Sequence, residues 1–374
     1  MSSHPLRLLV VAPYDLSRSG GVNNQVRAQA AALRRLGHAV RVCGPASAAL
    51  ADGEVPLGRP VRVNFFGTES GLGLDPRGAG ALGRLLKEPI DLVHVHEPFT
   101  PLMPWMALAY ARAPVVGTFH VHREQGHRVY AWSSWLLRPL ARRIARRIAV
   151  SEAARRTVAA HFPGRYDIVP NGIDFERFNS PGRPPALFEA GRPHVLYVGR
   201  LEPRKGVAFL VRAMADVQRR VPAVRLIVGG TGPDRDPLAR LAAALGVDVR
   251  FAGAIPESEL PAYFQASDVV CSPAIGDESF GIVLLEAMAS GRPVVASRID
   301  GYAELVNGRE CARLVPPSDA AALAGEISDL LGNAAARAQL SAAGREVARD
   351  YDWSTIAMRI MEIYQSALAA PVKP

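Results

Sequence analysis

The segment GDESFGIVLLEAMASG, residues 276–291, lies between two short apolar runs. Its apolar residues Leu284, Leu285 and Met288 recur at the spacing that places side chains on one face of a helix. Gly291 suits the left-handed residue that commonly ends a helix. The segment therefore predicts a strand, a short loop, a helix and a second strand, which is the repeating unit of a parallel α/β fold.

The same segment places two carboxylates around the N-terminus of the predicted helix. Glu278 comes just before the helix, and Glu286 follows eight residues later, roughly 12 Å along a helix. Backbone N–H groups of the first turn have no partner within the helix, and the helix dipole favours an anion there. A sugar, a diphosphate and a ribose bound end to end require this order of groups, although an ordinary amphipathic helix is the alternative for a lone motif. The residues of the first turn are Phe280, Gly281, Ile282 and Val283.

Length and composition indicate a globular protein of two domains. The chain has 374 residues, of which 49% are hydrophobic and 21% charged. Cys43, Cys271 and Cys311 are too widely spaced for a disulfide framework or a zinc motif, so we expect a reducing cytoplasm. The apolar residues 6–13 are too few for a signal peptide and predict a strand. Proline and arginine interrupt the apolar residues 101–116, so no transmembrane helix is expected.

Predicted strands alternate with predicted helices along the chain. This pattern favours an α/β protein of two doubly wound, Rossmann-like domains that face each other across a cleft. Residues 171–193 are rich in Pro, Gly and Arg and lack periodicity, as expected for a connection between domains. We therefore expect an N-terminal domain over residues 1–170 and a C-terminal domain over residues 171–354.

Some segments of the N-terminal domain have specific predictions. Residues 24–36 are predicted as a helix that follows a Gly-rich loop. Residues 67–83 are rich in Gly and are predicted as a loop, with at most a frayed helix over residues 76–87. The predicted strands of the two domains cover residues 8–12, 40–42, 61–65, 92–95, 115–119, 148–150, 195–198, 225–228 and 249–251.

The net charge of +9 is compatible with nucleic acid, an anionic membrane or an anionic substrate. Residues 136–148 fit a helix with five arginines on one half and apolar residues on the other. Two interpretations stay open: a core-facing helix with a solvated basic face, or a helix attracted to anionic lipid by about 1 kcal/mol per basic residue. Nucleic acid is disfavoured because no aromatic residues alternate with the arginines. The five are Arg138, Arg142, Arg143, Arg146 and Arg147.

A second signal for anion binding follows the first strand of the C-terminal domain. In residues 199–206, Arg200 and Lys205 place two cations at the carboxyl edge of a parallel sheet, where open α/β folds bind ligands. A charge-assisted hydrogen bond to phosphate contributes about 1.5–3 kcal/mol. Ordinary surface charge is the alternative interpretation.

Two Gly-rich loops follow predicted strands. Gly20 and Gly21 come after the first strand, and their lack of a Cβ would let the backbone approach a ligand closely. The loop does not match G-x-G-x-x-G, so a dinucleotide cofactor is not expected, and a plain tight turn is the alternative. Residues 229–233 form a similar loop that a structural turn explains equally well.

Histidines cluster in the N-terminal domain. His94 and His96 would lie on one face of a strand, which can bind metal, although strand ends often carry histidines. Residues 234–236, Asp-Arg-Asp, fit a metal–diphosphate motif, but they precede a helix, where Asp is a common cap. Because Arg200 and Lys205 already supply positive charge, we expect no metal and no other cofactor.

The carboxylates Glu278 and Glu286, with Phe280-Gly281 between them, resemble the signature of the family 4 retaining glycosyltransferases, which have the GT-B fold. In that family the first Glu contacts the donor sugar, the helix N-terminus binds the phosphates and the second Glu binds the ribose. The resemblance implies that Arg200 and Lys205 hold the diphosphate of the donor.

The resemblance implies roles for other residues too. It places the loop of Gly20 and Gly21 against the donor phosphate and the acceptor. It makes His120 a catalytic residue, together with Glu278, that steadies charge at the anomeric centre, and it places the backbone near Ile255 against the base. It also implies that the last helix, within residues 355–374, packs back onto the N-terminal domain.

Within the family, the chain resembles the phosphatidylinositol mannosyltransferases through residues 96–98, 117–120, 146–151 and 276–286. One departure is that those enzymes carry a densely basic segment where residues 71–77 stand here. The resemblance implies transfer of mannose from the nucleotide-sugar GDP-mannose, with retention, to a hydroxyl of a phosphatidylinositol-type or other lipid or glycan acceptor. It also implies a cytoplasmic protein, peripheral at the inner face of the plasma membrane.

Other functions remain as alternatives. A transferase that uses a UDP-sugar, with glucose or an N-acetylhexosamine, would need the same fold. A nucleotide-sugar epimerase would need no acceptor. A module that only binds anionic lipid would leave Glu278 and Glu286 without a role. An oxidoreductase is disfavoured by the missing dinucleotide motif.

Overall fold

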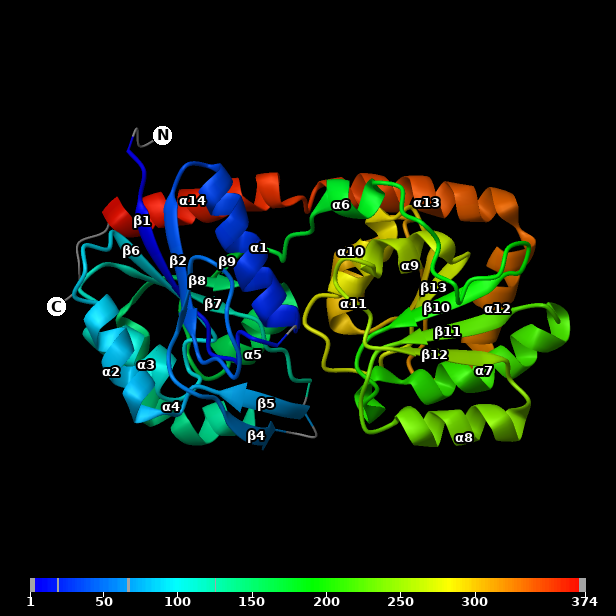
Figure 1. Cartoon of the computed structure of the whole chain (residues 1–374), viewed down its shortest axis with the longest axis horizontal. Helices are drawn as coiled ribbons and strands as arrows, with labels where there is room; N and C mark the ends of the chain where they lie inside the picture. Colours follow the sequence, from blue (N-terminus) through cyan, green and yellow to red (C-terminus); the bar gives the residue numbers. More distant parts are fainter. Residues whose placement is uncertain (1–3, 19, 66–67, 125, 370–374) are drawn as a thin grey trace. The chain divides into compact units, whose positions relative to one another are not determined.

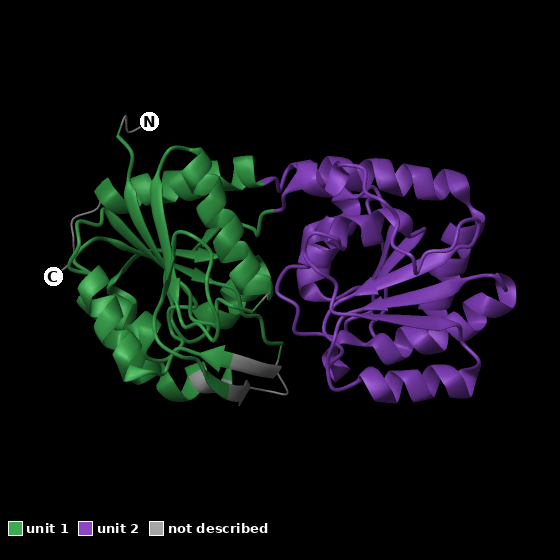
Figure 2. Ribbon diagram, in the orientation of Figure 1, with its two compact units in different colours: residues 1–172, 353–374 green, residues 173–352 purple. Residues whose placement is uncertain are grey.

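The structure is a computed structural model that describes residues 4–18, 20–65, 68–124 and 126–369. The chain forms two compact units, which are coloured separately in Figure 2. Unit 1 consists of residues 1–172 and 353–374, and unit 2 of residues 173–352. In the described part of the chain, no helix is long and apolar enough to cross a membrane.

Unit 1 alternates strands and helices (Figure 1). Its strands are β1 (Arg7–Val11), β2 (Ala39–Gly44), β3 (Glu54–Pro56), β4 (Val61–Phe65), β5 (Thr68–Leu72), β6 (Leu92–His96), β7 (Val115–Phe119), β8 (Ile144–Ala149) and β9 (Asp167–Ile168). Its helices are α1 (Gly21–Arg35), α2 (Pro76–Leu85), α3 (Met103–Tyr110), α4 (Arg128–Arg142), α5 (Glu152–Ala159) and α14 (Trp353–Ala369).

Seven strands of unit 1 form a parallel sheet in the order β3-β2-β1-β6-β7-β8-β9, and β4 and β5 form a separate antiparallel hairpin. Strand β1 divides its side chains between two cores. Leu8 and Val10 pack with α1 and α14, whereas Leu9 and Val11 pack with residues of α2, α3 and α4. Because both faces of the sheet are buried, its central strands are nearly continuous apolar runs.

Unit 2 repeats this architecture. Its strands are β10 (His194–Val198), β11 (Arg225–Gly229), β12 (Val249–Gly253), β13 (Val269–Ser272), β14 (Val294–Ser297) and β15 (Arg313–Val315), in the sheet order β12-β11-β10-β13-β14-β15. Its helices are α6 (Phe175–Asn179), α7 (Val207–Arg220), α8 (Arg235–Leu245), α9 (Leu260–Ala266), α10 (Ile282–Ala289), α11 (Asp300–Val306), α12 (Ala320–Gly332) and α13 (Ala334–Arg349), with a short 3-10 helix, η1 (Pro203–Lys205). All neighbouring strands are parallel.

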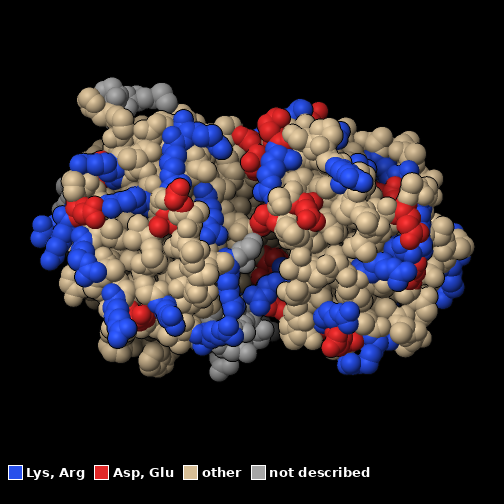
Figure 3. All heavy atoms as spheres, in the orientation of Figure 1, with Lys and Arg blue, Asp and Glu red and all other residues tan. Residues whose placement is uncertain are grey.

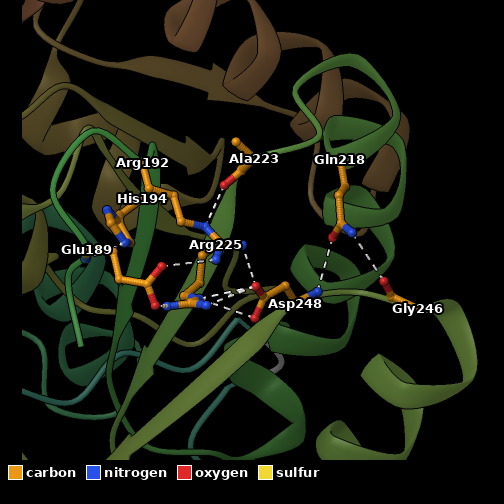
Figure 4. A network of polar contacts seen from close by, with 8 residues as sticks. All are labelled: Glu189, Arg192, His194, Gln218, Ala223, Arg225, Gly246 and Asp248. Carbon is orange, nitrogen blue, oxygen red and sulfur yellow. Dashed lines mark hydrogen bonds and ion pairs between the residues drawn. The ribbon is translucent and has the colours of Figure 1, made fainter.

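Ion pairs hold the amino ends of the strands in unit 2 (Figure 4). Arg225, the first residue of β11, is 5% exposed and donates to the carboxylates of Asp248 and Glu189. Arg192 donates to the carbonyl oxygen of Ala223 at 2.6 Å. The charged groups at this edge are paired with one another. Ligands of open α/β sheets bind at the opposite edge, outside the carboxyl ends of the strands.

Two predictions for the first hundred residues are wrong in part. Helix α1 begins at Gly21, three residues before the predicted start, and Gly20 is its extended N-cap. The Gly-rich segment, predicted as a loop from residue 67, contains strand β5 and a complete helix α2. Asp75 caps α2 by accepting the N–H of Arg77 at 2.9 Å, and a proline occupies the first helical position. These capping signals outweigh the low helix propensity of Gly.

The predicted arginine helix over residues 136–148 is correct only in its first half. Helix α4 ends at Arg142, and the chain then enters β8, which pairs with β7. Ile144 and Ile148, four residues apart, fit one helix face, but in β8 they enter the two different cores of unit 1. Sheet pairing and burial therefore override the helical pattern.

The five arginines consequently do not share one surface. Arg143 donates to the carbonyl oxygen of Ala111 at 2.9 Å, and Arg147 donates to that of Ala141 at 3.0 Å. Arg146 donates to the hydroxyl of Ser366. Arg138 and Arg142 remain exposed on α4.

Candidate active site

Five charged residues meet at the carboxyl edge of the sheet of unit 2. The Glu278 carboxylate lies in the loop between β13 and α10, and its Oε1 is 2.5 Å from Arg204 Nη1 and 2.7 Å from Lys205 Nζ. A second carboxylate, Glu202, is 3% exposed and pairs with Arg204 Nε at 3.3 Å and with Arg200 Nη2 at 2.7 Å. The structure thus brings together the predicted residues Glu278, Arg200 and Lys205.

Two members of this cluster were missed by the sequence analysis. Arg204 links the two carboxylates, and Glu202 is the buried anion between two arginines. Both residues lie within the cationic segment 199–206, and its alternation of acidic and basic residues was the available signal. In the structure, the acidic residue Glu202 pairs with the basic residues on either side of it.

The loop of Lys205 is fixed against the loop of Glu278 by a close backbone approach. Gly206 ends η1 with φ 67°, and a Cβ there would lie 1.9 Å from the carbonyl oxygen of Pro273. The N–H of Ile275 donates to the carbonyl oxygen of Arg204 at 2.9 Å. Only glycine fits at position 206, and its presence places the two charged loops side by side.

The Gly-rich loop of residues 229–233 also allows a close approach of two backbone segments. A Cβ on Gly230, whose φ is 136°, would lie 1.8 Å from the carbonyl oxygen of Gly199. Leu201 donates its N–H to the carbonyl oxygen of Thr231 at 2.9 Å, which extends the pairing of β10 and β11 beyond the sheet. Close packing of two backbones therefore accounts for this loop. Ile255 packs closely against the start of the same loop, because its Cδ1 is 2.3 Å from the position that a Cβ on Gly229 would occupy.

The residues at the start of α10 have buried or half-buried side chains and backbone N–H groups that could bind a ligand. Gly281 is the N-cap with φ 100°, and a Cβ there would meet the ring of Tyr302 at 2.8 Å. Phe280 is 5% exposed and packs edge-to-face on Tyr351, so its side chain belongs to the core. What Phe280, Gly281 and the half-buried Ile282 and Val283 can offer an anion is their N–H groups.

Glu286 lies one turn further along α10 and is half-buried. The pKa of its carboxyl is raised to about 8, mainly by burial and also by the nearby Glu257, whereas Arg177 opposes both effects. A carboxyl in this state holds its proton near neutral pH and can donate as well as accept a hydrogen bond.

Buried histidines line the carboxyl ends of β6 and β7 in unit 1. His120, which follows β7, has its Nε2 2.8 Å from Nδ1 of His96, and the two rings are stacked. His94 is bonded to the hydroxyls of Thr118 and Tyr364. Burial lowers the pKa of His120 to about 4 and the pKa of His94 to about 3, so these imidazoles are neutral at physiological pH.

Glu97 is a further buried carboxylate that the sequence analysis included only within residues 96–98. It has the unusual φ of 46°, is 1% exposed, and accepts the N–H groups of His120 at 2.5 Å and Val121 at 2.9 Å. Burial raises its pKa to about 7, against the lowering effect of those N–H donors and of the Tyr130 hydroxyl. Glu97 therefore fixes the backbone position of His120.

A small cavity of about 20 Å³ adjoins His120 in unit 1, which is enough for about one water molecule. Its polar lining comes from Gln25, Gln29, Thr118, His120 and Asn171. The predicted glycines Gly20 and Gly21 lie at the start of α1, where a Cβ on either would meet no described atom within 4 Å. Ser19, the residue before them, lies outside the described residues.

The metal-binding types of side chain are distributed as follows in the structure. Among the described residues, no group of three or more His, Cys, Asp or Glu side chains is arranged to hold a metal ion. Asp234 is the N-cap residue of α8, and Asp236 is paired with Arg235 at 2.8 Å. The Asp-Arg-Asp sequence is thus part of a helix start.

Comparisons with known proteins agree with this arrangement. Residues 19–177 match the model of "Glycosyltransferase Family 4", and residues 183–347 match "Glycosyl transferases group 1". A phosphatidyl-myo-inositol mannosyltransferase of Mycobacterium tuberculosis is 37% identical over 98% of this chain and 99% of its own. A GDP-mannose-dependent alpha-(1-6)-phosphatidylinositol monomannoside mannosyltransferase of Mycolicibacterium smegmatis is 34% identical over 77% of this chain and 80% of its own.

Solved structures support the fold independently. HepE of Anabaena, in complex with UDP and glucose, superposes with a TM-score of 0.77 at 23% identity, over 96% of this chain and 100% of its own. The expected fold, GT-B with two Rossmann-like domains, is confirmed. With full-length identity of 37% to a named relative and matches of both its halves, the chain belongs to the family 4 glycosyltransferases.

Proposed function

We propose that this glycosyltransferase moves mannose from GDP-mannose to a hydroxyl of a phosphatidylinositol-type lipid, with retention at the anomeric carbon. The names of the two mannosyltransferase relatives support the donor and the acceptor. The observation that carries the proposal is the pairing of Glu278 with Arg204 and Lys205 beside the N-terminus of α10. With Arg200 held in the same cluster by Glu202, this arrangement provides cations for a diphosphate and a carboxylate for sugar hydroxyls at one edge of the sheet.

In the proposed mechanism, the cations act on the leaving group. Arg200, Lys205 and the N–H groups of residues 280–283 stabilise the negative charge that develops on the diphosphate as the bond from the anomeric carbon to oxygen breaks. The acceptor oxygen forms the new bond on the same face, and its proton passes to the departing phosphate oxygen. The protein supplies no nucleophile, and these cations provide the positive charge that a metal ion would otherwise contribute.

The remaining residues orient the donor. Glu278 accepts hydrogen bonds from sugar hydroxyls, and Glu286 binds the ribose. The backbone near Ile255 recognises the base, and the loop of Gly20 and Gly21 lies against the donor phosphate and the acceptor. His120, held neutral by burial, hydrogen-bonds the sugar and steadies the charge at the anomeric carbon.

A UDP-sugar is the second candidate donor, because the structural neighbour HepE holds UDP and glucose. Nucleic acid is not favoured as a partner, since basic side chains on the face in Figure 3 are spread out and interspersed with acidic ones. We propose a peripheral location at the inner face of the plasma membrane, with Arg138 and Arg142 as the members of the predicted basic set that remain exposed on α4.

Calorimetric titration with GDP and with UDP, each with and without magnesium, tests the donor. Tighter binding of GDP, independent of magnesium, is expected. Tighter binding of UDP would replace mannose by another hexose, and binding of neither nucleotide would refute the proposal.

Variants test the role of the charged cluster. Lys205→Ala and Glu278→Ala are each expected to lower kcat about 100-fold, because each removes a group that acts on the reacting donor. Arg219→Ala, which removes an exposed cation of α7, is the control and should retain full activity. Full activity of either cluster variant, with the fold intact by circular dichroism, would contradict the assignment.

A further inference from the structure

The outward face of α4 exposes large apolar side chains. Trp132 is 76% exposed, Trp135 is 70% exposed and Leu136 is 49% exposed. They follow the i, i+3, i+4 spacing of one helix face. The opposite face is buried against the rest of unit 1 through Tyr130, Ser133, Leu137 and Ala141. Helix α4 is therefore anchored by one face and presents a second apolar face to the solvent.

The exposure of these tryptophans is selective. The chain has four tryptophans. Trp353 is 4% exposed, and the half-buried Trp105 donates its indole N–H to the carbonyl oxygen of Phe99 at 3.1 Å. An exposed pair of tryptophans on a rigid helix indicates a surface that is covered by an apolar partner during function.

Positive charge borders this face. At about 100° per residue, Arg142 lies roughly 20° and Arg138 roughly 60° from Trp135 around the helix. Both arginines are exposed, and residues 128–142 contain no acidic residue. Helix α3, which packs on α4, adds Tyr110 at its end, 65% exposed. Aromatic residues beside arginines are the composition that the headgroup region of an anionic bilayer accommodates.

We propose that the face formed by Trp132, Trp135 and Leu136 binds an anionic phospholipid bilayer, with the two indoles at headgroup depth and Arg138 and Arg142 against lipid phosphates. The inference rests on the proposed function in one respect, namely that the acceptor is a membrane lipid. It differs from the sequence-based hypothesis, in which five arginines formed the contact. Here the apolar face inserts, and the two arginines assist it.

Intrinsic tryptophan fluorescence can test this proposal on the whole chain. Vesicles of phosphatidylcholine with phosphatidylinositol are expected to shift the emission to shorter wavelength, and brominated acyl chains are expected to quench it. The double variant Trp132→Ser/Trp135→Ser should bind these vesicles, in a flotation assay, at least about tenfold more weakly. Trp105→Phe, the matched control, should bind as the wild type does.

Charge is tested in the same assay. Arg138→Gln/Arg142→Gln should weaken vesicle binding by about fivefold per arginine. The control Arg219→Gln/Arg235→Gln removes two exposed cations of unit 2 and should have no effect. Wild-type binding by either α4 double variant would overturn the proposal.

Two further outcomes keep this proposal separate from the transferase function. GDP binding without any vesicle binding would refute the membrane contact and leave the transferase function in place. Vesicle binding without GDP or UDP binding would support the membrane contact and refute the transferase function. A dimer that forms without lipid and is lost in Trp132→Ser/Trp135→Ser would overturn the proposal in favour of a second copy of the chain.

Discussion

Glu97→Gln tests how far burial controls the site in unit 1. The carboxylate of Glu97 ties the end of β6 to the end of β7 through the N–H groups of His120 and Val121. Glutamine keeps one oxygen for these two donors and removes the proton that titrates. The substitution therefore changes the charge with little change in shape.

The magnitude follows from the pKa of Glu97. Burial raises this pKa from the ordinary 4.5 to about 7. The folded chain then holds a proton that the unfolded chain has lost between pH 4.5 and about 7, so stability falls as pH rises through this window and levels off above it. At about 1.36 kcal/mol for each pKa unit, the loss is about 3 kcal/mol.

Urea unfolding of wild type and Glu97→Gln at about pH 5 and about pH 8 measures this effect. The free energy of unfolding of the variant, relative to wild type, should rise by about 2.5 kcal/mol between the two pH values, because a small part of the total loss already lies below pH 5. The control Glu88→Gln alters a carboxylate on the same unit that is 44% exposed, and should show a change below about 0.5 kcal/mol. An equal difference at both pH values for Glu97→Gln would refute the reasoning.

Three other substitutions have defined outcomes. Gly206→Ala should destabilise unit 2 by more than Gly246→Ala. The two φ values are nearly equal, 67° and 66°, but only at position 206 would the added Cβ lie 1.9 Å from a carbonyl oxygen. In urea unfolding, Gly246→Ala should cost about 1 kcal/mol, and an equal cost for Gly206→Ala would contradict the steric argument. Tyr302→Phe removes the 2.8 Å hydrogen bond to Ser272 and should cost about 1 kcal/mol, with a neutral result arguing against that bond. Glu286→Gln should gain stability over wild type as pH rises from 4.5 to about 8, since the raised pKa makes ionisation unfavourable in the folded chain, and a gain as pH falls would reverse this sign.

The strands of both sheets were predictable because burial on two faces demands apolar residues throughout. The predicted residues 8–12 and 225–228 differ by one residue from β1 (Arg7–Val11) and β11 (Arg225–Gly229). The short edge strands β3 and β9 lack such a run and were not predicted. Residues 148–150 were predicted as a strand, but the first part of β8 was assigned to a helix because an apolar spacing of four satisfies the helical period. The pairing of β8 with β7 shows that the whole segment is a strand.

The residues of the candidate site could be predicted only in part, because some of them meet only in the folded chain. Glu278 and Lys205 stand out in the sequence because a helix start and a strand end surround them. Arg204 and Glu97 do not, because their roles depend on which atoms the fold brings within reach. The pairing of side chains 74 residues apart, as in Arg204 and Glu278, leaves no local pattern.

The charged cluster of unit 2 carries its own counterions. Its three cations, Arg200, Arg204 and Lys205, face two carboxylates, Glu202 and Glu278, so its sum of charges is 3 − 2 = +1. Such a cluster projects a weak field into the solvent, and it offers little attraction to stray phosphate or nucleic acid at a distance. An anion must instead compete at contact range with carboxylates already in place, so recognition depends on fit. Because a bound phosphate would displace protein carboxylates as well as salt ions, the affinity of the site for a diphosphate should depend only weakly on ionic strength.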